Sequence, residues 1–113
     1  MKKEFEEVNG LMVLTKFLKD NKRNNLVSVC DNLKTQYPNS LIVLVGEENG
    51  GYPIVVSSSQ EAIKRGLLAG KVVKELATIL LGSGGGRPDL ASGAGKDISN
   101  LEKAFQTVKE MVK

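Results

Sequence analysis

The sequence predicts a single small domain of the α/β (α+β) class, in which helices pack against a mixed β-sheet. Two aliphatic segments, 41–45 and 52–57, flank a turn that contains Asn49-Gly50, which is the pattern of a β-hairpin. Segments with apolar residues at helical spacing stand on either side of this pair. The 113 residues suit one core, so one domain is expected over residues 1–113.

The N-terminal third is expected to form a strand followed by a helix. Residues 1–10 are charged and end in the turn signal Asn9-Gly10, and the apolar run 11–17 then predicts a buried strand. A polar connection over 20–25 leads into a segment in which Leu26, Cys30, Leu33 and Tyr37 form one apolar stripe.

The ends of this helix, expected over 26–37, also have sequence signals. Asn24 or Asn25 is expected to cap its start, because an Asn side chain can accept a free backbone N–H. Pro38 is expected to end it, because the residue before a proline disfavours helical geometry.

The two central strands differ in their expected surroundings. The uninterrupted aliphatic run 41–45 is typical of a strand covered on both faces. The run 52–57 carries Pro53, which cannot donate a ladder hydrogen bond and therefore favours a sheet edge or a strand end.

Two further helices are expected in the second half. The segment 61–81 has an apolar stripe from Gly66 onward, and its small residues indicate either very close packing or a helix that starts at Gly66. The apolar stripe from Leu101 to Val112 predicts a final helix, preceded by a capping box of Ser99 and Glu102.

A glycine-rich segment joins these two helices and is the most unusual part of the chain. Residues 82–96 hold half of the twelve glycines, with Arg87-Pro88-Asp89 among them. Such a segment is expected to lie outside regular secondary structure, with a short extended passage at 90–92. Composition alone leaves an ordered functional loop and a flexible linker as equal alternatives.

The positive charge of the protein is localised. Residues 1–59 and 97–113 each carry equal numbers of acidic and basic side chains, so the net charge of +3 comes entirely from residues 60–96. A basic patch of this kind suggests a polyanionic partner such as nucleic acid, and the alternative is a solvated helix face.

Composition excludes several classes of catalytic site. The chain has no histidine and one cysteine, so it has no Ser-His-Asp or Cys-His arrangement, no imidazole ligand and no thiolate zinc cluster. Cys30 is expected to be a core residue, and a lone cysteine points to an intracellular setting. No apolar run is long enough to cross a membrane. An autonomous enzyme is therefore not expected.

The glycine segment does not match the nucleotide-binding signatures. Arg87 breaks a Gly-x-Gly-x-x-Gly pattern at its third glycine, and Asp97 stands where a P-loop has Ser or Thr. Contact with a nucleic-acid backbone fits better, because glycines allow close approach and Arg87 can reach a phosphate. The basic region has no aromatic residue, so recognition of folded RNA by shape is favoured over base stacking on aromatic rings.

The motif resembles the signature of the C-terminal domain of alanyl-tRNA synthetases. That family has a run of glycines, then Arg-Pro-Asp, an aliphatic residue and Ala, then a second glycine cluster and Lys-Asp. The corresponding residues here are 84–91 and 93–97, and the upstream segment 66–77 is also similar. Ser83 and Ala94 depart from the pattern, and both are small. The resemblance covers nearly the whole chain.

The resemblance implies a non-catalytic, tRNA-binding module of an alanine--tRNA ligase, related to the domain that accompanies DHH phosphoesterases. It implies contact with the tRNA elbow, in support of aminoacylation and editing of tRNA(Ala), in the cytoplasm, without membrane or DNA. ATP and zinc would belong to absent parts of the parent enzyme, and no cofactor is expected here. The chain resembles an excised domain, and the alternative is a free-standing paralogue.

Two sets of residues are the candidate tRNA contacts. The resemblance supplies the loop residues and Lys96, and the charge distribution adds three basic residues of the preceding segment. The set is Gly84, Gly85, Gly86, Arg87, Pro88, Lys96, Lys71, Lys74 and Arg65.

Two alternatives remain open. The first is a dimerisation or protein-interaction module, free-standing or within the synthetase, in which Gly66, Ala69, Gly70 and Ala77 would form a subunit contact. The second is a nuclease-associated domain of the DHH type. Those relatives typically carry a histidine after the glycines, where this chain has Arg87.

Overall fold

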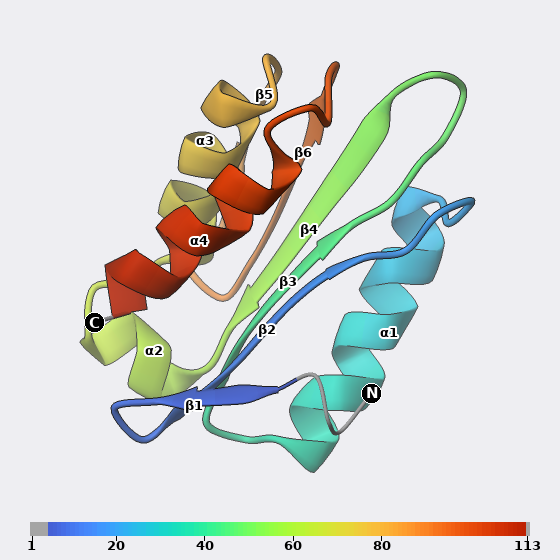
Figure 1. Ribbon diagram of the computed structural model, residues 1–113. Helices are drawn as coiled ribbons and strands as arrows, with labels where there is room; N and C mark the ends of the chain where they lie inside the picture. The colour runs from blue at the N-terminus through green and yellow to red at the C-terminus, as the bar shows by residue number, and fades with distance from the viewer. Residues whose placement is uncertain (1–4, 113) are drawn as a thin grey trace.

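A six-stranded mixed sheet forms the centre of the computed structural model, which describes residues 5–112 (Figure 1). The strands lie in the order β1-β2-β3-β4-β6-β5, with β2 and β3 parallel and every other neighbouring pair antiparallel. Their bounds are Glu6–Val8 (β1), Leu11–Phe17 (β2), Ser40–Val45 (β3), Tyr52–Ser58 (β4), Ser83–Gly86 (β5) and Leu90–Gly95 (β6). The predicted mixed sheet is confirmed.

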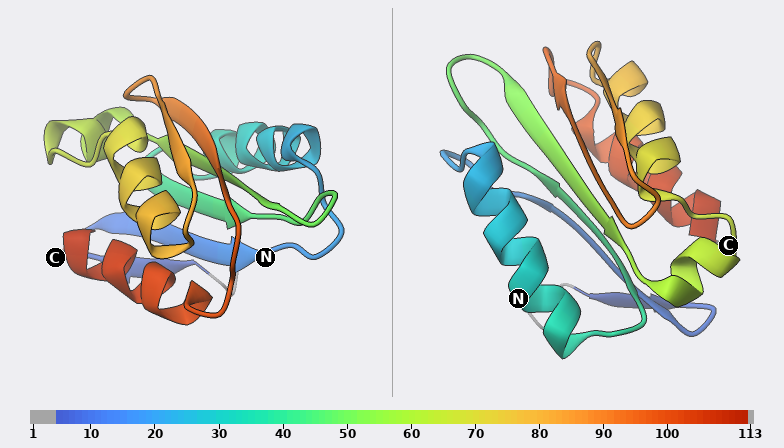
Figure 2. Two further views of the ribbon diagram at one scale, coloured as in Figure 1. Left: turned by 90° about the horizontal axis from the view of Figure 1, so that it is seen from above. Right: turned by 180° about the vertical axis from the view of Figure 1, so that it is seen from behind.

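Helices cover both faces of this sheet. Their bounds are Arg23–Gln36 (α1), Gln60–Lys64 (α2), Ala69–Ile79 (α3) and Leu101–Val112 (α4). The α1 helix packs on one face, and α3 and α4 lie on the opposite face (Figure 2). Successive residues of β3 belong to the two cores in turn, and all six are buried. The aliphatic run 41–45 therefore has the two-sided burial that its pattern predicts.

The first strand is one that the sequence did not predict. The charged residues Glu6 and Glu7 pair with β2 through a two-residue turn, in which Asn9 has φ 53° and Gly10 has φ 83°. Positive φ at both turn positions is the geometry that Asn-Gly favours in tight hairpins. The turn signal was therefore correct, but it marks a hairpin and not only the start of β2. Residues 1–4 of the charged segment lie outside the described residues.

The α1 helix connects the parallel strands β2 and β3. Parallel neighbours need a long crossover connection of this kind, because a tight turn would make them antiparallel. It begins at Arg23, and its N-cap Lys22 makes no side-chain capping hydrogen bond. The expected cap at Asn24 or Asn25 is wrong, because both residues already lie inside the first turn. The helix ends at Gln36, two residues before Pro38, as expected.

The predicted hairpin of β3 and β4 is confirmed, with Val43 opposite Val56. Its turn is Asn49-Gly50, and both residues have positive φ. Pro53 is the second residue of β4, so its expected place near a strand end is correct. Of the two predicted places the strand end is therefore the one adopted, because β4 lies between β3 and β6 and is not at a sheet edge.

The segment expected as one helix over 61–81 is two helices. The short α2 is capped by the Ser59 hydroxyl, which accepts the N–H of Ala62. Gly66, with φ 86°, then turns the chain before α3 begins at Ala69. A left-handed glycine is a common helix terminator, so Gly66 ends one helix and does not start the next.

The last helix, α4, lies where its apolar stripe predicts. It begins at Leu101, and the Ser99 hydroxyl donates a hydrogen bond to Asp97 Oδ1 at 2.6 Å. The Ser99 backbone N–H donates to the same oxygen at 2.8 Å. The capping box of Ser99 with Glu102 is therefore replaced by a turn that is held by Asp97.

Candidate nucleic-acid interface

The glycine-rich segment is an ordered β-hairpin at the edge of the sheet. We call residues 83–95, comprising β5, the 87–89 turn and β6, the glycine hairpin. Gly84 lies opposite Gly93, and β6 continues the sheet by pairing with β4. The linker alternative and the expectation of irregular structure are both wrong. Burial against α3 compensates here for the low intrinsic strand preference of glycine.

Close packing of α3 explains the glycines in the two strands. A Cβ atom at Gly84 would lie 2.5 Å from Val73 Cγ1 and 2.6 Å from Gly93 Cα. A Cβ atom at Gly93 would lie 2.7 Å from the Ser83 carbonyl oxygen and 2.9 Å from Val73 Cγ1. The side chain of Val73 therefore fills the space that side chains would need at both glycines.

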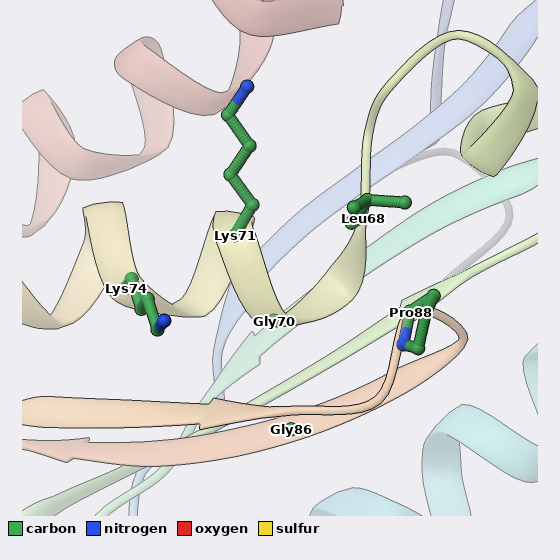
Figure 3. Close-up of a pocket in the computed structure, with 6 residues that line it drawn as sticks. All are labelled: Leu68, Gly70, Lys71, Lys74, Gly86 and Pro88. Atoms are coloured by element: carbon green, nitrogen blue, oxygen red, sulfur yellow. The ribbon is translucent and has the colours of Figure 1, made fainter.

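The first turn of α3 approaches the hairpin equally closely. A Cβ atom at Gly70 would lie 2.8 Å from the carbonyl oxygen of Gly86. The close-up in Figure 3 shows Gly70 on α3 directly above Gly86 on β5. Ala69, Gly70 and Ala77 are buried in this packing. These three small residues are thus used inside the domain, and they do not form an exposed patch for a subunit contact.

Backbone hydrogen bonds fix the turn that carries Arg87, Pro88 and Asp89. The Pro88 carbonyl accepts the N–H of Ala69 at 2.8 Å, and the Asp89 carbonyl accepts the N–H of Ser58 at 2.9 Å. The Arg87 N–H donates to the Leu90 carbonyl at 3.2 Å and closes the hairpin. The turn is therefore attached to both α3 and the end of β4.

The Arg87 side chain projects from this fixed turn into solvent. It is 70% exposed, and its Nε lies 3.4 Å from Asp89 Oδ1, whose own side chain is 55% exposed. An exposed ion pair of this kind contributes little to stability. The guanidinium can therefore exchange this carboxylate for a phosphate, which it can bind through two parallel hydrogen bonds.

The two lysines of α3 point in different directions. In Figure 3, Lys74 points toward β5 and Lys71 points away from it, toward α4. Lys74 Cε lies 3.5 Å from the position of a Cβ atom at Gly85, so this side chain runs beside the hairpin. Both lysines line the pocket between α3 and the hairpin, and Lys71 also lines a second depression with Arg65 and Met111.

The other two basic candidates lie away from Arg87. Arg65 forms an ion pair with Glu61, with Nε 3.2 Å from Oε2. Lys96 follows the last residue of β6, and its N–H donates to the Leu80 carbonyl at 2.8 Å. Because β6 has six residues, Lys96 stands roughly 20 Å from the turn. Of the predicted basic residues, Lys71 and Lys74 line the pocket between α3 and the hairpin, beside Gly86 and Pro88.

The opposite side of the hairpin has a groove that the sequence did not predict. It has a volume of about 240 Å³ between α1 and the hairpin, and both Arg23, at the start of α1, and Arg87 line it. Val27, Val55 and Leu90 supply apolar lining, and Gly85 and Ser92 supply small residues. Arg23 was not identified from the sequence, because residues 1–59 carry no net charge and Arg23 lies about 60 residues before the glycine hairpin.

Residues 5–112 contain neither a candidate metal site nor a candidate membrane-spanning helix. In that range, no group of three or more Cys, Asp or Glu side chains could hold a metal ion. No helix of the described part of the chain has the length and apolar character needed to cross a membrane.

Comparisons with known proteins connect this fold to one family. Residues 10–113 match the family model described as the DHHA1 domain. The chain is 35% identical over 109 residues to an alanine--tRNA ligase of Oceanobacillus iheyensis. It is 40% identical over 107 residues to that of Bacillus pumilus. These matches cover 96% and 95% of the chain, and 12% of the length of each ligase.

A solved structure shares the fold of this chain. The crystal structure of the C-Ala domain from Aquifex aeolicus alanyl-tRNA synthetase superposes with a TM-score of 0.86 and 24% sequence identity. The superposition covers 96% of this chain and 96% of that domain. At this identity the likeness establishes a shared fold.

Proposed function

The chain belongs to the DHHA1 domain family, in the form found in the C-terminal region of alanyl-tRNA synthetases, and we propose on this premise that it is a tRNA-binding module. It matches only that region of the ligases and includes no catalytic part. The parent activity we propose is alanine--tRNA ligase, to which this domain contributes tRNA binding in the cytoplasm.

The exposed Arg87 side chain on a turn with a fixed backbone is the observation that carries this proposal. Two carbonyl hydrogen bonds hold the turn, so the guanidinium is presented from a defined position. Lys74 adds a second positive charge beside the same hairpin. Binding of RNA phosphates by such groups releases counterions, so the affinity should fall with salt.

The partner we propose is the folded outer corner of tRNA, with tRNA(Ala) as the cognate species. The hairpin is nearly free of side chains along β5, so a curved RNA backbone can approach the main chain closely. Lys71 reaches the edge of this surface through the pocket at Gly86 and Pro88, and Lys96 and Arg65 do not line that pocket. We propose that Lys71 and Lys96 act as peripheral electrostatic contacts.

Titration of a fluorescently labelled tRNA(Ala) transcript with the domain, followed by anisotropy at two salt concentrations, tests the proposal. The wild type should bind at low salt and more weakly at high salt, and Arg87→Ala should reduce the affinity about tenfold. Lys103→Ala, on the exposed face of α4, is the control with the same loss of charge. Absence of binding by a folded wild type, or equal effects of the two variants, would contradict the proposal.

A second candidate function is self-association. The glycine hairpin ends the sheet at β5, and an edge strand offers unpaired main-chain groups to another chain. Sedimentation velocity of the domain without RNA measures this directly. A monomer across the accessible concentration range would argue against a homodimer formed by this domain.

A further inference from the structure

We propose that the groove between α1 and the glycine hairpin holds one unpaired nucleotide of the bound RNA, with Arg23 and Arg87 contacting the phosphates on either side of it. The inference rests on the proposed tRNA-binding function and adds a second contact surface to it. It assigns a role to Arg23, and it distinguishes the two sides of the hairpin.

The groove exists because α1 covers only part of its face of the sheet. This helix packs on β3 and β4 through Leu26, Cys30 and Leu33. Beyond β4, the same face continues onto β6 and β5, where alternate residues point toward α1 and no helix covers them. Ser92 and Gly85, which are paired across the hairpin, lie on this uncovered part and line the groove.

The charge of the groove favours a polyanion. Arg23 is the first residue of α1, and the first turn of this helix contains no acidic residue. No side chain caps the helix start, so its first backbone N–H groups add partial positive charge at the same end. Asp89 is the nearby acid, and it already pairs with Arg87.

The size and lining of the groove suit a single nucleotide. A volume of about 240 Å³ is below the roughly 300–1,000 Å³ of clefts that hold drug-sized ligands. The partly exposed side chains of Val27 and Leu90 offer apolar contacts for one face of a base, and the Ser92 hydroxyl can donate to or accept from its edge. Arginine guanidinium groups stack on bases as well as binding phosphate, so this surface needs no aromatic ring.

The decisive comparison is between two neighbouring residues with the same charge. Lys22 is exposed and does not line the groove, whereas Arg23 does. We expect Arg23→Ala to weaken binding of the tRNA(Ala) transcript about tenfold and to lower the slope of log affinity against log salt by about 0.7 to 0.9. Lys22→Ala should change the affinity less than twofold. Equal effects of the two variants would overturn the inference.

A second measurement locates the contact without depending on either charge. In 15N-labelled wild-type protein, a four-nucleotide oligouridylate should shift the amide signals of Val27 and Ser92. Ser92→Leu, which fills the groove from its floor, should abolish those shifts while leaving the spectrum of the α3 side unchanged. Shifts confined to Lys74 and the α3 side would overturn the groove assignment.

These results separate the inference from the proposed function. If the wild type binds tRNA and Arg87→Ala weakens it, but Arg23→Ala matches Lys22→Ala, the tRNA-binding function stands and the groove inference fails. If the folded wild type does not bind tRNA at low salt, both fail.

Discussion

The backbone N–H of Ala69, the first residue of α3, donates a hydrogen bond to the carbonyl oxygen of Pro88 at 2.8 Å. This bond satisfies one of the amide groups that a helix start leaves free. It also places the helix directly on the turn that carries Arg87. The position of the arginine is therefore determined by the packing of α3 on the glycine hairpin, and the following predictions begin with that packing.

Two adjacent glycines of β5 should respond differently to the same substitution. Gly84→Ala places a methyl group against Val73 and the backbone of Gly93, so we expect the free energy of unfolding to fall by about 2 kcal/mol. At Gly85 the nearest atom to an added Cβ is Lys74 Cε at 3.5 Å, an ordinary contact. Gly85→Ala should therefore stay within about 1 kcal/mol of the wild type.

Urea denaturation followed by circular dichroism measures both variants. Both variants add the same methyl group, at neighbouring positions of β5. Each variant is therefore the control for the other. Similar losses of stability in both would show that strand propensity, and not the approach of α3, determines where glycine is needed.

The two lysines of α3 should contribute unequally to RNA binding. Lys74 runs beside the hairpin, whereas Lys71 points toward α4. We expect Lys74→Ala to weaken tRNA binding about threefold to tenfold and Lys71→Ala to weaken it less than threefold. Anisotropy titrations at a single low salt concentration are sufficient. A larger effect at Lys71 would contradict this prediction and would indicate that the RNA binds nearer the depression that Lys71 shares with Arg65.

The Cys30 thiol should be unreactive while the protein is folded. Burial, with a smaller contribution from the charge of Asp31, raises the pKa of Cys30 to about 12, against an ordinary value of 9.0. The thiolate is the reactive species, so alkylation at pH 8 should require unfolding. Labelling with iodoacetamide, followed by mass spectrometry with and without urea, tests this. Rapid labelling without denaturant would contradict it.

The same pKa gives a prediction for alkaline stability. Because the folded pKa is raised, the contribution of Cys30 is complete below pH 9 and is lost as the pH rises from about 9 toward about 12. The unfolded chain releases the thiol proton over this range, whereas the folded protein retains it. Cys30→Ala removes this contribution, so its stability should decline less steeply above pH 9. Parallel curves for the two proteins would be the contrary result.

Asp97 should depend on Ser99 for its acidity. Hydrogen bonds from the Ser99 hydroxyl, and then from its backbone N–H, lower the pKa of the Asp97 carboxyl. This contribution is therefore present above the ordinary aspartate range and is lost as the pH falls through the lowered pKa. We expect Ser99→Ala to raise the pKa of Asp97, as measured by carboxyl 13C chemical shifts. An unchanged titration would show that the hydroxyl bond does not form in solution.

The spacing of apolar residues along the sequence was sufficient to predict much of the fold. The strands at Leu11–Phe17, Ser40–Val45 and Tyr52–Ser58, and the final helix, all carry enough apolar residues to indicate both their type and their burial. The first strand, Glu6–Val8, could not be recognised this way, because edge strands bury little and can be charged.

The glycine hairpin was the main error in the fold. Glycine is depleted in strands, so a run of glycines predicts a loop. A strand is predicted only if a neighbouring helix is known to leave no space for side chains there. The sequence contains Val73, but its position above Gly84 and Gly93 depends on how α3 sits on the sheet. The family motif selected the residues of the hairpin turn as the candidate site, and their role stays a prediction. The structure then placed Lys71 and Lys74 on the α3 side of the hairpin, away from Lys96 and Arg65, and it added Arg23 on the side of the groove that Arg87 lines.

The attachment of β6 to β4 has a consequence for the order of assembly. Ala91 pairs with Val56, so this ladder closes only after a long intervening segment has been brought back to the sheet. The strands of the hairpin have little tendency to form alone, and they need both β4 and α3 in place. We expect the surface that presents Arg87 to be the last part of the domain to form during folding and the first to be lost. RNA binding would then report complete folding, and a partly folded chain would carry the same residues without the ability to bind.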